Sequence, residues 1–204
     1  MVTDGLDPRN ETFVGWLREH GMRRLAAVTA TADTAQVTRL TEEGVEVRIV
    51  PPIGIGGALA ELPVAGVVHL AQPAPLRALA EFDPAEAAAD LDRYRIAAEL
   101  DAATRGTSTP MFVVTGSAAA HFGAVGAAGR AAAEGALLAL AAARRAAGTP
   151  AQLLRWMPRA DTGDLSVRDA AGMAVSGVTP PTPPTCTRRS ACCCGPGWRT
   201  WTGR

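Results

Sequence analysis

The sequence predicts one α/β domain with a doubly wound parallel sheet and helices on both faces, on three observations. Short apolar segments recur along the chain, segments rich in Ala, Leu, Glu and Arg separate them, and the two kinds alternate throughout. Nearly continuous apolar strands are typical of a parallel sheet, because helices cover both of its faces. A length of 204 residues fits one such domain.

Five segments are predicted as strands and four as helices. The strands are expected where apolar and β-branched residues cluster, at residues 25–29, 45–50, 66–70, 111–115 and 152–156. The helices are expected between them, at residues 11–20, 34–43, 84–104 and 127–147. The stretch Gly54-Ile-Gly56-Gly57 lacks the full glycine spacing of a phosphate loop, so we interpret it as an ordinary loop.

Charge and hydropathy exclude two classes of partner. Lys plus Arg and Asp plus Glu are 20 each, so no long-range field attracts the chain to nucleic acid or to an anionic membrane surface. No segment has the run of about 18 apolar residues that a membrane span needs. We therefore expect a cytoplasmic protein.

The composition changes near residue 178. Residues 179–204 are rich in Pro and contain all four cysteines, which are Cys186, Cys192, Cys193 and Cys194. Three adjacent thiols without a nearby His lack the spacing of a tetrahedral zinc site, so no metal is expected. We predict a folded domain over residues 1–178 and a disordered tail over residues 179–204, and we hypothesise a shifted reading frame as the origin of the tail.

The run Met111-Phe-Val-Val-Thr-Gly-Ser117 and its continuation to Trp156-Met-Pro158 resemble the ketoreductase domains of modular polyketide synthases. Those domains belong to the short-chain dehydrogenase/reductase family. The resemblance covers about residues 1–178 and is most specific between residues 111 and 158. It implies a Rossmann fold, NADPH as cofactor, and an acyl carrier protein and neighbouring synthase domains as partners.

The same resemblance assigns four catalytic positions. Ser117 matches the family's serine, whereas Arg130 stands at the tyrosine, Glu134 at the asparagine and Tyr94 at the lysine. A guanidinium keeps its proton, so Arg130 cannot act as the general acid. Arg130 and Glu134 are one helical turn apart, and we expect an exposed ion pair between them. We expect Tyr94 to be a half-buried core residue.

The segment that should hold the cofactor differs from the family. Only Gly5 matches in the turn after the first strand, where glycines let backbone amides approach a pyrophosphate. Asp4 and Asp7 place negative charge there, and Pro8 removes a donor. We therefore expect no NADPH binding, although the family resemblance implies it.

Only residues 1–3 remain where the family has its first strand, and we expect that strand to be missing. Without that central strand two interior edges of the sheet would be unpaired, so we expect an unstable chain: a synthase fragment, a wrongly placed start or a decayed gene product.

His69 and His121 follow strands, but a single histidine without a paired nucleophile or carboxylate is usually structural.

Three functions remain open. The first is a ketoreductase-like domain that is inactive as a reductase and survives as a structural remnant or fragment. The second is NADPH-dependent reduction of a β-ketoacyl chain bound to an acyl carrier protein. The third is a noncatalytic interaction module within a synthase.

Overall fold

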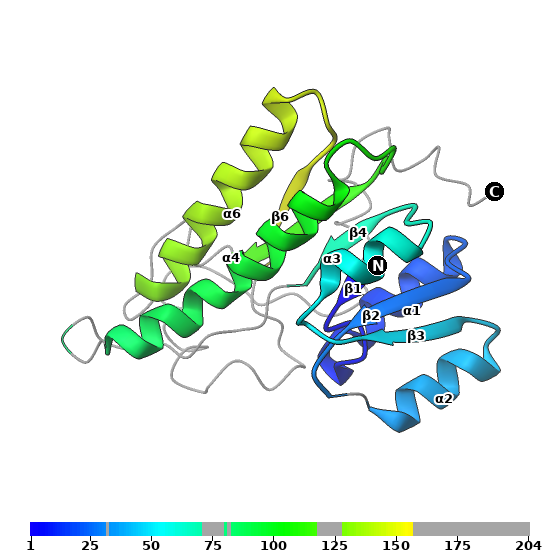
Figure 1. Cartoon of the computed structure of the whole chain (residues 1–204). Coiled ribbons are helices and arrows are strands. Elements are labelled where there is room, and N and C mark those ends of the chain that lie inside the picture. The colour runs from blue at the N-terminus through cyan, green and yellow to red at the C-terminus, as the bar shows by residue number, and fades with distance from the viewer. Residues whose placement is uncertain (32, 71–79, 81–82, 118–127, 157–204) are drawn as a thin grey trace, which may run out of the picture.

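A parallel sheet forms the centre of the computed structural model, which describes all residues except 32, 71–79, 81–82, 118–127 and 157–204 (Figure 1). Among the described residues the sheet has six strands in the order β3-β2-β1-β4-β5-β6. Their bounds are β1 (Val2–Thr3), β2 (Arg24–Val28), β3 (Glu46–Val50), β4 (Val67–His69), β5 (Phe112–Ser117) and β6 (Gln152–Trp156). Every predicted strand is present with boundaries that shift by at most two residues.

The helices connect successive strands. They are α1 (Glu11–Glu19), α2 (Thr34–Glu42), α3 (Ile55–Glu61), α4 (Pro84–Thr104) and α6 (Ala128–Ala146), with the short 3₁₀ helix η1 (Pro8–Asn10) before α1. The four helices predicted from the sequence are confirmed to within one residue at each end. Asp83 caps α4 by accepting the Ala85 N–H at 2.7 Å.

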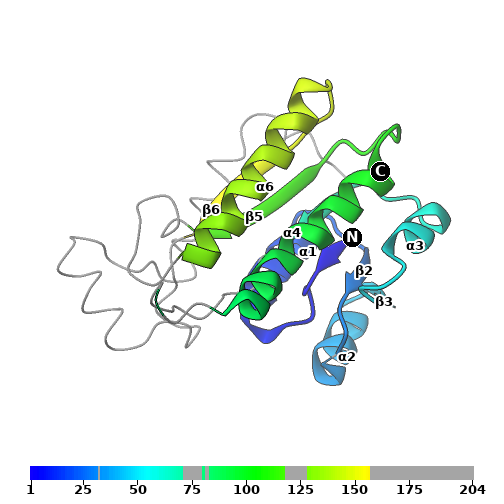
Figure 2. The same cartoon turned by 60° about the vertical axis from the view of Figure 1, so that its left-hand side comes forward.

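Helices cover both faces of the sheet (Figures 1 and 2), and an apolar cluster lies on each face. One contains buried residues of α1 and α2, and the other contains buried residues of α3, α4 and α6. Strand β5 contributes to both, because Val113 points to the first cluster while Phe112 and Val114 point to the second. The predicted doubly wound, Rossmann-like sheet with helices on both faces is confirmed.

The expectation that the first strand is missing is wrong. Val2 and Thr3 form β1, which pairs in parallel with β2 and β4. Both residues are buried, and neighbouring backbone groups lengthen the pairing: Asp4 N–H donates to Val28 O and Val68 N–H donates to Met1 O, each at 2.9 Å. A very short strand therefore joins the two halves of the sheet.

The interpretation of residues 54–57 as an ordinary loop is also wrong, because α3 begins there. Gly54 has a φ of 91°, a conformation that glycine adopts without strain, and Ile55 starts the helix. Ile55 and Leu59 lie one turn apart on the same face and are buried against the sheet. Their burial offsets the low helix propensity of Gly56 and Gly57.

Several predictions fall outside the described residues. These concern His121, the domain boundary at residue 178, the tail and its cysteines. Within the described ranges, no helix has the length and apolar character that crossing a membrane requires. In the same ranges, no group of three or more His, Cys, Asp or Glu side chains is placed to hold a metal ion.

Candidate functional site

Parallel strands end at the same edge of a sheet, and the edge formed here by the ends of β1, β4, β5 and β6 is called the carboxyl edge below. Ligands of open α/β sheets bind outside this edge, near the point where the strand order reverses. That point lies between β1 and β4. The residues that follow β1 and the residues that end β5 therefore form the candidate site.

Ser117 is the last residue of β5 and is half-buried at the carboxyl edge. It lies opposite Trp156 in the register between β5 and β6. Its backbone N–H donates to Glu134 Oε2 at 3.0 Å. The structure thus brings together two of the predicted site residues, and the contact uses the backbone of Ser117.

Glu134 is buried on α6, so the expectation of an exposed ion pair with Arg130 is wrong. Its side chain is 8% exposed and its Oε1 accepts from Arg155 Nε on β6 at 3.0 Å. The space for the carboxylate comes from Gly116, because a Cβ on that residue would overlap both carboxylate oxygens. Glu134 thus packs against the ends of β5 and β6, and both of its hydrogen-bond donors lie outside α6.

Arg130 and Tyr94 lie on different helices. Arg130 is half-buried in α6, one turn before Glu134. Tyr94 is half-buried in α4 and packs against the apolar cluster shared by α3, α4 and α6, as expected from the sequence. The phenol is therefore part of the packing on that face of the sheet.

The turn after β1 is closed by its own hydrogen bonds. Asp7 N–H donates to Asp4 O at 3.0 Å, Arg9 N–H donates to Asp7 Oδ1 at 2.8 Å, and Asn10 N–H donates to Asp7 O at 2.9 Å. The Asp7 carboxylate also pairs with the Arg9 guanidinium at 2.6 Å. These bonds leave the acidic Asp7 side chain at the start of η1, where it caps the helix.

Gly5 and Leu6 hold this turn against the protein interior. Leu6 is 2% exposed and belongs to the apolar cluster beneath α1 and α2. The Gly5 carbonyl accepts a long hydrogen bond from Gln36 Nε2, at 3.5 Å. A Cβ on Gly5 would lie 3.1 Å from Val2 Cγ1, so the glycine permits close packing of the turn on β1.

His69 ends β4 and is buried in the sheet. Its Nδ1 lies 3.0 Å from Thr3 Oγ1, which also accepts the Leu70 N–H at 2.9 Å. Thr3 and His69 are neighbours in the register between β1 and β4. The pair therefore ties the short β1 to β4 at the carboxyl edge.

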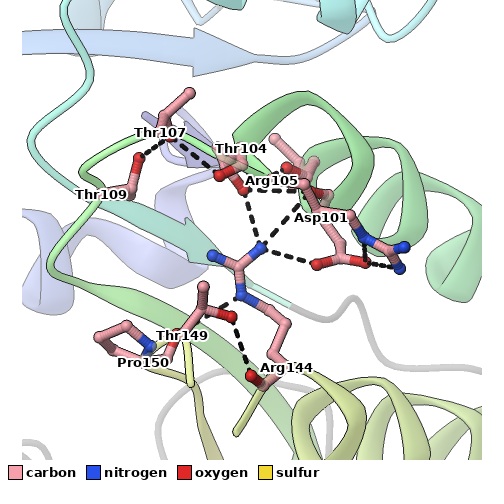
Figure 3. Close-up of polar contacts among 9 residues, drawn as sticks. Asp101, Thr104, Arg105, Thr107, Thr109, Arg144, Thr149 and Pro150 are labelled. Atoms are coloured by element: carbon pink, nitrogen blue, oxygen red, sulfur yellow. Dashed lines mark hydrogen bonds and ion pairs between the residues drawn. The ribbon is translucent and has the colours of Figure 1, made fainter. Parts of the chain in front are cut away.

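Sequence reasoning missed a second polar cluster, at the opposite edge of the sheet (Figure 3). Arg144 on α6 and Asp101 on α4 form an ion pair at 2.7 Å, and both side chains are 3% exposed. Arg144 also donates to Thr104 Oγ1 at 2.9 Å, and its guanidinium lies 4.0 Å from the centre of the Phe112 ring. Asp101 and Arg144 lie in helices of ordinary composition, so the sequence did not indicate that these charged side chains are buried.

Opposing effects set the pKa of Asp101. Burial raises it, but hydrogen bonds from Arg105 and Arg144 and the positive charges of both guanidinium groups lower it by more, so the pKa lies below its ordinary value. The hydrogen bond to Asp101 and the carboxylate charge raise the pKa of Arg105. Asp101 is thus held as an anion between two cations.

Comparison with known proteins gives the family. The family model described as KR domain matches residues 1–161, and no curated protein matches. The chain is similar to the ketoreductase from the first module of phoslactomycin biosynthesis in Streptomyces sp. HK803, with 24% identity and a TM-score of 0.81 over 100% of this chain and 50% of that one.

Two further solved structures share the fold. The first ketoreductase of the tylosin PKS is 21% identical, with a TM-score of 0.84 over 96% of this chain and 46% of that one. An oxidoreductase of the short-chain dehydrogenase/reductase family from Burkholderia thailandensis is 18% identical, with a TM-score of 0.71 over 99% of this chain and 87% of that one.

The two ketoreductases indicate the extent of the match. The chain spans half, or slightly less, of their length. The family match covers the strands, the helices and both edges of the sheet described above. The chain belongs to the ketoreductase (KR) domain family.

Proposed function

We propose that the chain is a ketoreductase-like domain of a polyketide synthase that does not reduce ketones. The family match supports the first part of this proposal. The turn after β1 supports the second part, the absence of ketone reduction. Several of its backbone donors are already used, and its acidic residues disfavour a bound dinucleotide.

A pyrophosphate bound at the start of a helix needs free backbone N–H groups and a positive local potential. In this chain the N–H groups of Asp7, Arg9 and Asn10 donate within the turn, and Pro8 has none. The Asp7 carboxylate already occupies the position of an anionic cap. The residues of this turn therefore do not fit the pyrophosphate of NADPH.

The residues at the catalytic positions support the same conclusion. Reduction of a ketone needs a group that releases a proton to the carbonyl oxygen, and the guanidinium of Arg130 stays charged in water and in proteins. Glu134 is committed to Ser117 N–H and Arg155. Ser117 and Arg130 can each donate a hydrogen bond to a carbonyl, but neither can supply the hydride.

The test is turnover of the purified full chain with NADPH and a β-ketoacyl thioester, followed by nicotinamide absorbance. We expect no oxidation that depends on the ketone, in the parent chain or in the Arg130→Tyr variant, because restoring a phenol does not rebuild the turn after β1. An active polyketide synthase ketoreductase, assayed in parallel, is the positive control.

The opposite outcome is a ketone-dependent rate in a sample that unfolds cooperatively. If Ser117→Ala abolished that rate, the activity would belong to this site and the proposal would be wrong. The second function, NADPH-dependent reduction, would then replace it.

As a domain of a synthase, the chain would work beside an acyl carrier protein and neighbouring synthase domains, in the cytoplasm. We expect a pull-down with the immobilised chain to retain purified synthase segments in preference to unrelated proteins of equal charge. Equal retention of both would contradict a role as a synthase domain and leave the family membership unaffected.

A further inference from the structure

We propose that Gly116, the Ser117 backbone amide and the Arg155 guanidinium form a binding site for a carboxylate, and that Glu134 occupies it as an internal ligand. The three groups are called the carboxylate clamp below. The clamp uses no residue of the turn after β1, so its test is separate from the test of NADPH turnover.

The two donors of the clamp reach different oxygens of the Glu134 carboxylate. Ser117 N–H donates to Oε2 and Arg155 Nε donates to Oε1, each at 3.0 Å. The donors come from adjacent strands, β5 and β6, whereas the acceptor comes from α6. An arrangement of one neutral and one cationic donor around two oxygens suits a carboxylate, because hydrogen bonds that involve charged groups are the stronger ones.

Gly116 gives the clamp its shape. A Cβ at this position would overlap both oxygens and the carboxyl carbon of Glu134, which form the end of a flexible side chain. The missing side chain of Gly116 is therefore the space in which the carboxylate lies. Since the three atoms nearest to that Cβ all belong to the carboxylate, Gly116→Ala should expel the carboxylate and leave β5 intact.

The Glu134 carboxylate is buried, so the stability of the fold depends on its two donors. The Glu134 side chain is 8% exposed and the Arg155 side chain is 28% exposed. A carboxylate with so little contact with water needs both donors, because a buried charge without partners is strongly unfavourable. The clamp therefore fastens α6 to the ends of β5 and β6, and it engages the Ser117 amide at the candidate site.

The ligand class follows from the atoms that Glu134 supplies. Glu134→Ala removes one methylene group and the carboxylate, and acetate consists of a methyl group and a carboxylate. Acetate should therefore bind the emptied clamp with the same two donors, whereas chloride offers no pair of oxygens. A bulky carboxylate such as pivalate exceeds the space that the removed atoms leave.

The experiment is denaturant unfolding of the full-length Glu134→Ala variant in acetate and in chloride at equal ionic strength. A ligand that binds only the folded state lowers the unfolding equilibrium constant by about tenfold once its concentration is about ten times its dissociation constant. We expect this decrease with acetate for Glu134→Ala, and a much smaller one for the parent chain and for Glu134→Ala combined with Arg155→Gln. Equal effects of acetate and chloride on Glu134→Ala would contradict the clamp.

A second set of variants decides the matter if Glu134→Ala does not fold in any buffer. Glu134→Gln and Arg155→Gln should each raise the unfolding equilibrium constant. In the double variant this constant should be at least about fivefold lower than the product of the two single effects predicts. Gly116→Ala should also raise the constant, whereas Gly135→Ala should not, because a Cβ on Gly135 would have nothing within 4 Å. Additive single effects and an unchanged Gly116→Ala variant would overturn the proposal.

Discussion

Asp101 and Arg144 illustrate how a single buried pair can join two helices. Each side chain is almost fully removed from water, and their contact is 2.7 Å long. Arg144 Nη1 also donates to Thr104 Oγ1 at 2.9 Å, and Arg144 Nε donates to Pro150 O at 3.4 Å. A buried pair of this kind contributes little by its presence, but the loss of one partner leaves the other as an uncompensated charge.

We predict that Asp101→Ala lowers the free energy of unfolding by about 3 to 5 kcal/mol at neutral pH, because Arg144 would keep its buried charge without a carboxylate. Urea unfolding followed by circular dichroism measures this change. Arg105→Ala is the matched control, because the Arg105 side chain binds the same carboxylate but is 72% exposed. It should change the stability far less, and an equal loss in both variants would contradict this account of Asp101.

The same pair predicts a dependence of stability on pH. The pKa of Asp101 in the folded chain is lower than the ordinary value of 3.8, so ionisation of this carboxylate stabilises the fold above about that pH. The contribution is lost as the pH falls through the lower, folded-state pKa. The difference in unfolding free energy between the parent chain and Asp101→Asn should therefore shrink in acid, and a difference that grows in acid would contradict the assignment.

Helix α3 is the element that sequence reasoning misread. Its seven residues include Gly56 and Gly57, which lower helix propensity, and Gly54 at its start resembles part of a flexible loop. The decisive contribution is tertiary: Ile55 is fully buried and Leu59 is 8% exposed. Two buried residues one turn apart are too few to form a periodic pattern that identifies a helix.

We predict that Gly57→Ala stabilises the chain by about 0.5 to 1 kcal/mol, because alanine favours the helix and a Cβ at this position would have nothing within 4 Å. Gly54→Ala provides the contrast, because Gly54 has a φ of 91° and a side chain there should destabilise the chain. Thermal unfolding distinguishes the two. A loss of stability in Gly57→Ala would indicate that α3 is not helical at this position.

The longer elements could be predicted because their signals are local. Strand β6 (Gln152–Trp156) and helix α4 (Pro84–Thr104) have the predicted bounds, since apolar runs and the Asp83-Pro84 start are visible in the sequence. The burial of Glu134 could not be predicted, because it depends on Gly116 and Arg155, which are distant in sequence. The spacing of four residues between Arg130 and Glu134 shows that they share a helix face. It does not show which residues of other elements they contact.

At the scale of the whole molecule, the sheet depends on its shortest strand. Strand β1 has two residues, yet it joins β2 to β4 and so places the two apolar clusters on one continuous sheet. The expectation of a missing strand treated the length of β1 as too small to pair. It did not include the hydrogen bonds of Met1 O and Asp4 N–H, which extend the pairing at both ends.

In this chain the fold of the family and the chemistry of its site are separate. The KR domain match and the six-stranded parallel sheet show the fold, whereas function depends on a few positions at the carboxyl edge. At that edge three amides of the turn after β1, those of Asp7, Arg9 and Asn10, donate within the turn, and Glu134 fills the space beside Ser117. The proposed loss of reductase activity depends first on the turn, because without the cofactor no substitution near Ser117 matters.

The most direct measurement is therefore a fluorescence titration of the folded, full-length chain with NADPH. We expect no saturable change in nicotinamide fluorescence with this chain, whereas an active ketoreductase in the same buffer should bind NADPH. Cooperative unfolding of the same sample establishes that the chain is folded during the titration. Saturable binding in the micromolar range would contradict the central claim, because it would require the turn between Asp4 and Asn10 to accept a pyrophosphate.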